Sequence, residues 1–249
     1  MTSNSLSWKS SCCADRGGAT VAARRGGRLL LIAALLLLPG MAGAQQAVSF
    51  ATTDGALIYA HEYGAGTRGV VLAHGGRRNK ESWHEQAQAL AAAGYHVLAF
   101  DFRGFGQSHG PGQSDLYTAP LQLDVLAAID WLRAHGARKV DVIGASMGGS
   151  AAGAAVIASP RGWVHRLILL AAAPDGDAAR LNCPTLFIVA RDDANAEGPR
   201  LPGIRAAYAR APRPKRLVIV PGTAHAQFLF ETNQRARVMR EIELFLQAP

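Results

Sequence analysis

Short apolar segments alternate with longer alanine-rich segments from about residue 68 to the end of the chain. The short segments are rich in Val, Ile, Leu and Phe, which favour strands, and the longer ones carry apolar residues at helical spacing. The expected strands are 48–52, 57–63, 69–74, 95–100, 139–144, 166–171, 185–190 and 216–220. The expected helices are 81–93, 120–135, 147–159, 202–211 and 231–247.

Several of these strands are apolar at nearly every position, as in 140–143 and 186–189. Such runs are typical of strands that are covered on both faces, which is the situation in a parallel sheet between helices. The first two strands are expected to form a hairpin through 53–56, because Asp54-Gly55 is a strong turn signal. The pattern predicts an α/β fold with a mostly parallel, eight-stranded sheet flanked by helices.

The first 44 residues have a different character from the rest. Arg24, Arg25 and Arg28 precede an unbroken apolar run at 29–38, and Ala42-Gly43-Ala44 follows after a Pro-Gly break. A basic flank, a short apolar run and a small-x-small site are the three parts of an export signal. We therefore expect 1–44 to be a signal peptide cleaved after Ala44, and 45–249 to be one exported domain, periplasmic or secreted. An uncleaved membrane anchor and an overlong start are the alternatives.

Composition narrows the function classes. The 249 residues are 49% hydrophobic and 18% charged, which does not fit a disordered chain. The net charge is +8, but the first 44 residues contribute five Lys and Arg against one Asp, and the remaining basic residues are scattered. No basic run alternates with aromatic residues, so a nucleic-acid partner is not expected. Three cysteines cannot form a disulfide scaffold of this size, and we expect Cys183 to be a small core residue.

The segment Gly144-Ala145-Ser146-Met147-Gly148 fits the pattern G-x-S-x-G. It lies between an expected strand and an expected helix, which is the strand-turn-helix setting that a nucleophilic serine requires. The flanking glycines fit this interpretation because strand and helix approach closely at such a turn. The alternative is a glycine-rich helix start with Ser146 as a simple cap.

A serine hydroxyl needs a base, and the base needs an acid that orients it. His225 follows the strand 216–220, and Asp192 and Asp193 follow the strand 185–190, so both lie where loops leave the carboxyl ends of parallel strands. Alignment with a G-x-x-D loop pattern favours Asp193 as the acid, and Asp192 stays open. A loop histidine without a role and a solvated carboxylate are the alternatives.

Acyl transfer also needs hydrogen-bond donors for the oxyanion that develops on the carbonyl oxygen. The amide of Met147, next to the expected nucleophile, is one candidate. The second is the amide of Gly76, because His74-Gly75-Gly76 resembles an H-G-G oxyanion segment. We expect His74 to organise the loop, and a simple glycine turn is the alternative.

Together these motifs resemble the α/β-hydrolase superfamily, and the resemblance covers nearly all of 48–246. The segment 101–108 is similar to the D-x-R-G-x-G-x-S segment of many members, which implies structural roles for Asp101 and Arg103. Only residues 172–184 separate the sixth and seventh strands, where larger members insert a helical lid. The chain is therefore similar to lidless members, the dienelactone-hydrolase-like and small carboxylesterase groups. No cofactor and no metal are implied.

The resulting hypothesis is a serine hydrolase that cleaves a carboxylic ester, or a thioester, of a small-molecule substrate. The alternatives are a peptidase or amidase with the same machinery, and a catalytically silent binding module of this fold. A serine at the turn argues against the dehalogenase and epoxide-hydrolase branches, which use aspartate.

The expected pocket walls are Arg77, Trp83, Phe105 and Met147. The pair Arg77-Arg78 could favour anionic substrates, although a solvated face is the preferred interpretation. The oligomeric state cannot be read from the sequence.

Overall fold

The structure is a computed structural model that describes residues 45–249, so the expected signal peptide lies outside the described residues. Within this part of the chain the main sheet has eight strands in the order β1-β2-β4-β3-β5-β6-β7-β10. The strands β1 and β2 and the strands β2 and β4 pair antiparallel, and all other pairs are parallel. This confirms the predicted fold. The strands are β1 (Gln46–Ala51), β2 (Leu57–Tyr63), β3 (Arg68–Ala73), β4 (His96–Phe100), β5 (Lys139–Ala145), β6 (Arg166–Leu170), β7 (Thr185–Ala190) and β10 (Lys215–Val220).

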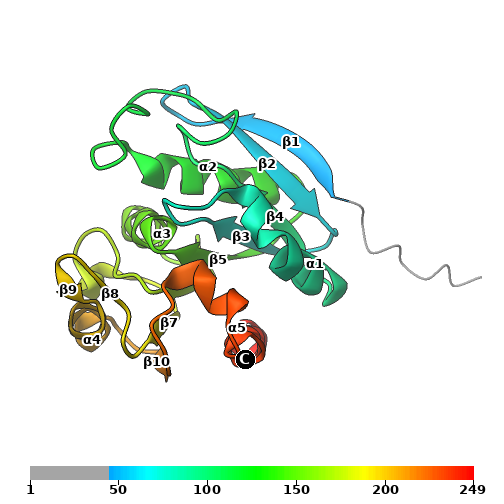
Figure 1. Cartoon of the computed structure of the whole chain (residues 1–249). Coiled ribbons are helices and arrows are strands. Elements are labelled where there is room, and N and C mark those ends of the chain that lie inside the picture. The colour runs from blue at the N-terminus through cyan, green and yellow to red at the C-terminus, as the bar shows by residue number, and fades with distance from the viewer. Residues whose placement is uncertain (1–44) are drawn as a thin grey trace, which may run out of the picture. The chain divides into compact units, whose positions relative to one another are not determined.

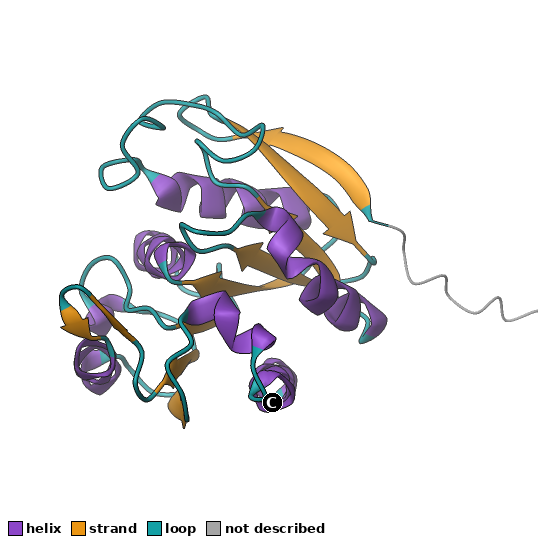
Figure 2. Ribbon diagram, in the orientation of Figure 1, coloured by secondary structure: helices purple, strands orange, loops and turns teal. Residues whose placement is uncertain are grey.

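Helices cover both faces of the sheet, as Figures 1 and 2 show. The helices α2, α3 and α4 lie on one side, and α1 and α5 lie on the other. The helices are α1 (His84–Ala92), α2 (Leu121–Ala134), α3 (Met147–Ala158), α4 (Leu201–Arg210) and α5 (Arg235–Gln247). None of the helices between residues 45 and 249 has the length and apolar character that a membrane crossing requires.

The burial of each strand follows its position in the sheet. Every residue of β4, β6 and β7 is buried, because helices cover both faces of these inner strands. The edge strand β1 instead alternates between exposed and partly buried residues. The continuous apolar runs in the sequence are therefore the centre of the core.

Three local features differ from the sequence-based expectation. The first helix region begins as a short 3-10 helix, Lys80–Trp83, and the last helix begins at Arg235, four residues later than expected. Before α5, Thr232 Oγ1 donates a hydrogen bond to the carbonyl of Leu229, and this turn separates α5 from the 3-10 helix Ala226–Glu231. A two-stranded hairpin, β8 (Ala194–Asn195) and β9 (Gly198–Pro199), follows β7 and was not expected.

A buried arginine joins three segments of the chain. The guanidinium of Arg103 donates to both carboxylate oxygens of Asp54, at 2.5 and 3.0 Å, and to Oδ1 of Asp124 at 2.6 Å. Asp54 lies in the predicted turn between β1 and β2, and Asp124 lies in the first turn of α2. The contacts agree with the structural role expected for Arg103. Asp101 is also fully buried and accepts hydrogen bonds from the backbone and the side chain of Lys80.

The Asp54 contact should make stability depend on pH. The hydrogen bond from Arg103 lowers the pKa of Asp54 to about 2. A carboxyl with a lowered pKa stabilises the folded state above its unfolded pKa and loses that contribution as the pH falls towards the folded pKa. We expect Asp54→Asn to lower the free energy of unfolding by about 1 to 2 kcal/mol at neutral pH. The difference should shrink as the pH falls from about 4 towards 2.

Urea denaturation of the unchanged chain and of Asp54→Asn, from neutral pH to about pH 2, measures the difference in the free energy of unfolding. Asp192→Asn is the matched control, because Asp192 is exposed and its side chain has no hydrogen-bond or ion-pair partner among residues 45–249. A loss for Asp54→Asn that is the same at about pH 2.5 as at neutral pH would contradict the assignment of this carboxylate contact.

Candidate active site

Ser146 lies in a sharp turn between the end of β5 and the start of α3. Its backbone is in the left-handed region, with φ 51° and ψ −118°, which is strained for a residue with a side chain. The amide of Ser146 donates to the carbonyl of Leu170 at the end of β6, at 2.9 Å. The turn is thus held to the sheet while the side chain is free to project from its carboxyl edge.

The glycines around Ser146 are required by close backbone contacts. A Cβ on Gly148 would lie 2.4 Å from the carbonyl oxygen of Ala73 and 2.5 Å from that of His74. A Cβ on Gly144 would lie 2.5 Å from the carbonyl oxygen of Gly148. These are distances that a real Cβ does not reach, so the strand, turn and helix can meet only if both positions are glycine. The glycines of the G-x-S-x-G pattern thus have the physical role that the sequence analysis gave them.

The structure brings Ser146, His225 and Asp193 into one hydrogen-bonded row. Nε2 of His225 lies 2.7 Å from Oγ of Ser146, and Nδ1 of His225 lies 2.8 Å from Oδ2 of Asp193. A carboxylate can only accept, so the Nδ1 proton points to Asp193 and Nε2 is left to accept from the serine hydroxyl. The Asp193 side chain is fully buried, and the His225 side chain is 27% exposed. This arrangement can remove the serine proton during attack on a carbonyl carbon.

The structure separates the two candidate carboxylates. Asp193 contacts His225, whereas Asp192 is exposed and does not. The amides of Arg191 and Asp192 donate to the carbonyls of Val220 and Gly222, which extends the pairing of β7 and β10 beyond the strand ends. This extension brings the loop that carries His225 beside Asp193.

The two expected oxyanion donors belong to segments that meet beside the serine. The amides of Gly76 and Met147 make no hydrogen bond to another group within residues 45–249, so both are free to donate to a ligand. Met147 Sδ lies 3.5 Å from the position that a Cβ on Gly76 would take, so the two segments are in contact. The arrangement has the donors that a developing oxyanion requires.

His74 is buried behind this loop, not at the nucleophile. Its Nδ1 lies 2.9 Å from the carbonyl oxygen of Gly75, and its Nε2 accepts from the amide of Phe102 at 3.2 Å. Burial lowers the pKa of His74, which fits a neutral ring with one donating and one accepting nitrogen. The contacts agree with the expected organising role.

Gln227 is a site residue that the sequence analysis missed. Its Oε1 accepts from the amide of Gly75 at 2.8 Å, and its Nε2 donates to Oγ of Ser82 at 2.7 Å. The side chain is buried, so these bonds fix the peptide between His74 and Gly75, which comes directly before the peptide that carries the Gly76 amide. Gln227 and Gly75 are 152 residues apart in the sequence, and no local pattern links them.

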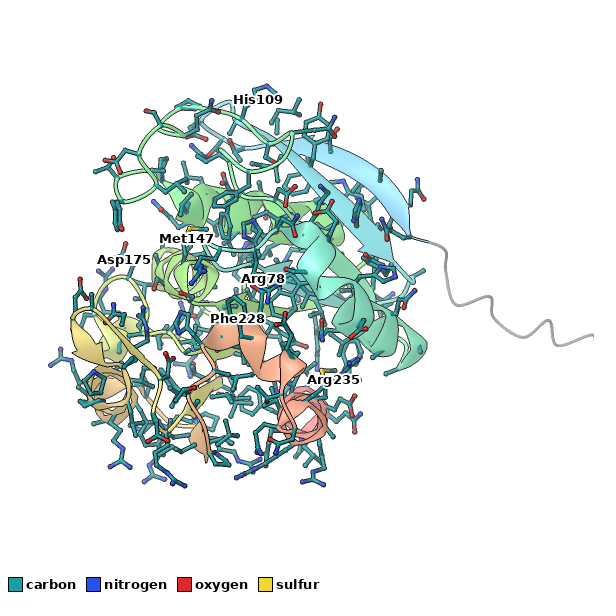
Figure 3. The ribbon with its side chains drawn as sticks, in the orientation of Figure 1. Arg78, His109, Met147, Asp175, Phe228 and Arg235 are labelled. Carbon is teal, nitrogen blue, oxygen red and sulfur yellow. The ribbon has the colours of Figure 1, made fainter. Side chains whose placement is uncertain are left out.

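Two cavities meet at Ser146 and Met147. We call the first the α4 cavity; its volume is about 880 Å³. We call the second the Arg77 cavity; its volume is about 620 Å³. The apolar residues that line the α4 cavity include Leu116, Leu121, Ala151, Ala172, Pro174 and Ile204, and its polar ones include Gln122, Ser150, Asp175, Asn195 and Glu197. The Arg77 cavity is lined mainly by Gly76, Arg77, Arg200, His225, Gln227 and Phe228. In Figure 3, Arg78 and Phe228 lie together beside Met147.

Two of the four expected pocket walls are wrong. Arg77 and Met147 line the cavities, but Trp83 and Phe105 do not. Trp83 is 1% exposed and packs on Phe230, with ring centroids 5.9 Å apart. Phe105 packs edge-on against His74, at 4.7 Å between ring centroids. Both aromatic rings support the loops of the site from behind.

Cys183, the cysteine that the described residues 45–249 contain, does not compete with Ser146 as a nucleophile. Cys183 is buried as expected, and burial raises the pKa of its thiol to about 12, so the thiolate is scarce. Among the described residues, no group of three or more His, Cys, Asp or Glu side chains is placed to hold a metal ion.

Comparison with known proteins assigns the family. A model of the alpha/beta hydrolase fold family matches residues 69–245. The chain therefore belongs to the α/β-hydrolase family.

Solved structures with this fold include an esterase from Exiguobacterium antarcticum, with a TM-score of 0.67 at 17% identity over 82% of this chain and 100% of that one. A dienelactone hydrolase from Anabaena variabilis has a TM-score of 0.66 at 24% identity over 81% of this chain and 96% of that one. At these identities the likeness shows the fold.

Curated relatives match over shorter regions. A 2-hydroxy-6-oxononadienedioate/2-hydroxy-6-oxononatrienedioate hydrolase of Cupriavidus pinatubonensis is 32% identical over 135 residues, 51% of this chain and 44% of that protein. An epoxide hydrolase of Caballeronia sordidicola is 37% identical over 83 residues, 32% of this chain and 25% of that protein. The chain thus spans a quarter to less than half of the length of these relatives.

The packing at the serine turn yields a stability prediction. Gly148→Ala places a methyl group against two backbone carbonyls that cannot move away, so the free energy of unfolding should fall by about 3 kcal/mol or more. Gly203→Ala is the matched control, because Gly203 lies in α4 with nothing within 4 Å of its Cβ position. It should raise stability by about 0.5 to 1 kcal/mol. Chemical denaturation measures both, and equal stability of the two variants would contradict the described contact.

Proposed function

We propose that this chain is a serine hydrolase that cleaves a carboxylic ester, or a thioester, through an acyl-Ser146 intermediate. The observation that carries the proposal is the row of hydrogen bonds from Ser146 through His225 to Asp193. The chain belongs to the alpha/beta hydrolase fold family, and solved structures with the same fold include esterases and a dienelactone hydrolase. Small-molecule esters are the proposed substrate class.

The proposed reaction has two halves. Ser146 Oγ bonds to the carbonyl carbon while its proton passes to Nε2 of His225. The bond from that carbon to the alcohol oxygen then breaks, and His225 gives its proton to the departing oxygen. In the second half, water bonds to the acyl carbon, its proton passes to His225, and the ester bond to Ser146 breaks. The products are one alcohol and one carboxylic acid, and Ser146 regains its proton.

The remaining groups act on charge and orientation. Asp193 keeps the imidazole in the required tautomer and stabilises its positive form, because its carboxylate is buried and 2.8 Å from Nδ1. The amides of Gly76 and Met147 donate to the oxyanion, and each such donor is typically worth about 3 kcal/mol of the barrier. One relative is named an epoxide hydrolase. A serine at the turn favours acyl transfer over the opening of an epoxide.

Access to the site is proposed to be open. The connection between β6 and β7 contains one short 3-10 helix, Ala178–Arg180, and is too short for a separate lid domain. The loop around Leu116 and Tyr117 and the β8–β9 hairpin line the cavities, and the Tyr117 side chain is fully exposed.

Export with cleavage after Ala44 is proposed from the sequence of the first 44 residues.

The first test removes the nucleophile. We expect Ser146→Ala to lower hydrolysis of p-nitrophenyl acetate at least about a thousandfold, because no acyl intermediate can form. Labelling of the unchanged chain by a fluorophosphonate should be lost in the variant. Circular dichroism serves to show that the variant is folded. Turnover that persists in the folded variant would reject the acyl-Ser146 route.

The second test compares the two neighbouring carboxylates. Asp193→Asn should lower kcat about a hundred- to ten-thousandfold, because the amide no longer holds the reactive tautomer of His225. Asp192→Asn, one position away and exposed, should change kcat less than about twofold. Steady-state hydrolysis of the same ester measures both. Similar losses in the two variants would argue against Asp193 as the orienting acid.

A further inference from the structure

The Arg77 cavity has a strong excess of positive charge. Three arginines line it, Arg77, Arg78 and Arg200, and no Asp or Glu is among its lining residues. Arg77 directly follows Gly76, whose amide is a proposed oxyanion donor, and it lines the same cavity as Ser146. The position of these side chains on the wall of the site argues against a merely solvated basic face.

The three arginines differ in how far the protein compensates their charge. Arg78 forms an ion pair with Glu231, and its guanidinium lies 4.0 Å from the centre of the Phe228 ring. Arg77 is exposed and has no carboxylate within 4 Å among residues 45–249; its guanidinium lies 6.0 Å from the same ring. The charge of Arg77 is therefore available to a ligand.

Arg200 is only loosely compensated. Its Nε lies 3.7 Å from Oδ1 of Asp193, beyond hydrogen-bond distance, and the other oxygen of that carboxylate binds His225. The Arg200 side chain is 34% exposed and lines both cavities. Among the three arginines of the Arg77 cavity, Arg77 is thus the one without a carboxylate partner among residues 45–249, and Arg200 has only this longer ion pair.

The α4 cavity has the opposite character. Its charged lining residues are Asp175, Glu197 and Arg200, and the rest of its lining combines apolar residues with polar ones such as Gln122, Ser150 and Asn195. An anionic group entering this cavity would meet two carboxylates. The two sides of Ser146 thus differ in charge.

The position of His225 indicates which half of an ester enters each cavity. His225 must give its proton to the departing alcohol oxygen, so the alcohol half leaves beside the imidazole. His225 lines the Arg77 cavity and is not among the lining residues of the α4 cavity. The alcohol half therefore belongs in the Arg77 cavity, and the acyl half belongs in the α4 cavity.

We propose that the Arg77 cavity binds a carboxylate on the alcohol half of the substrate, with Arg77 as the selecting residue, while the α4 cavity takes an acyl group without a negative charge. This inference rests on the proposed ester hydrolysis and adds the substrate class to it. A guanidinium suits this role because its planar donors match the geometry of a carboxylate.

The test compares esters that differ only in charge. The probes are 4-acetoxybenzoate, which carries a carboxylate on the alcohol half, and neutral 4-acetoxybenzamide, both assayed with the full chain. We expect kcat/KM to favour the carboxylate, and we expect Arg77→Gln to lower this preference about five- to tenfold. Added salt should lower the preference of the unchanged chain as well, because the contact is partly exposed.

Arg161→Gln is the matched control. Arg161 is an exposed arginine that follows the far end of α3, about 18 Å along the helix from Ser146, and its side chain has no partner among residues 45–249. This variant removes the same charge from the chain without touching the cavity, so it should leave the preference unchanged. An equal loss in the two variants would mean that the overall charge selects the anion, and would overturn the proposal.

A second pair of esters tests the assignment of the two halves. Monophenyl succinate carries its carboxylate on the acyl half, and methyl phenyl succinate is its neutral partner. Arg77→Gln should leave the ratio of kcat/KM for this pair within about twofold of its original value. A larger effect of Arg77→Gln here than on the acetoxy pair would overturn the assignment of the Arg77 cavity to the alcohol half.

A binding measurement separates this inference from the proposed function. Calorimetric titration of the Ser146→Ala protein with 4-acetamidobenzoate and with its neutral amide requires no turnover. The carboxylate should bind more tightly, and Ser146→Ala/Arg77→Gln should lose this difference. If no ester is hydrolysed and no fluorophosphonate labels Ser146, the proposed function fails. If hydrolysis occurs and the charge preference is absent or independent of Arg77, only the present inference fails.

Discussion

The contact between the first turn of α3 and the ends of β3 and β5 determines the geometry of the site. Gly148 lies so close to the carbonyls of Ala73 and His74 that a methyl group cannot be accommodated. This contact fixes where α3 begins, and it holds Ser146 in a left-handed conformation that an isolated chain would avoid. The strain is local, and the surrounding sheet stabilises it through the hydrogen bond from Ser146 to Leu170. The position of the nucleophile is therefore a property of the packed sheet.

The same contact aligns the oxyanion donors with the nucleophile. His74 and Gly75 continue from β3, so the strand that touches Gly148 also carries the amide of Gly76. Gln227 adds a third segment, because it follows His225 by two residues and accepts from the amide of Gly75. A displacement of the histidine loop would thus also move the oxyanion loop. The base and the donors are positioned as one unit, as preorganised stabilisation of a transition state requires.

Much of this arrangement could be predicted from the sequence because it depends on strand ends. The continuous apolar runs give the strands, and a parallel sheet brings their carboxyl ends to one edge, so Ser146, Asp193 and His225 could be placed together without coordinates. The parts that escaped prediction depend on contacts between distant segments. Gln227 meets Gly75 across 152 residues, and the indole of Trp83, expected on a pocket wall, turns inward to Phe230. No short-range pattern reports such contacts.

The residues that shape the two cavities come largely from loops, and this explains why the motifs predict chemistry and leave the substrate open. Leu116 and Tyr117 precede α2, and Asn195 and Arg200 belong to the segment around the β8–β9 hairpin. None of these side chains is fixed by sheet pairing of the main sheet, so their identity can vary without disturbing Ser146 or His225. Charge can then be distributed unevenly around a constant catalytic geometry. Of the two cavities in this chain, Arg77 and Arg78 line only the one on the side of the imidazole, and Asp175 and Glu197 line only the α4 cavity, so the two halves of a substrate meet different electrostatic environments at one nucleophile.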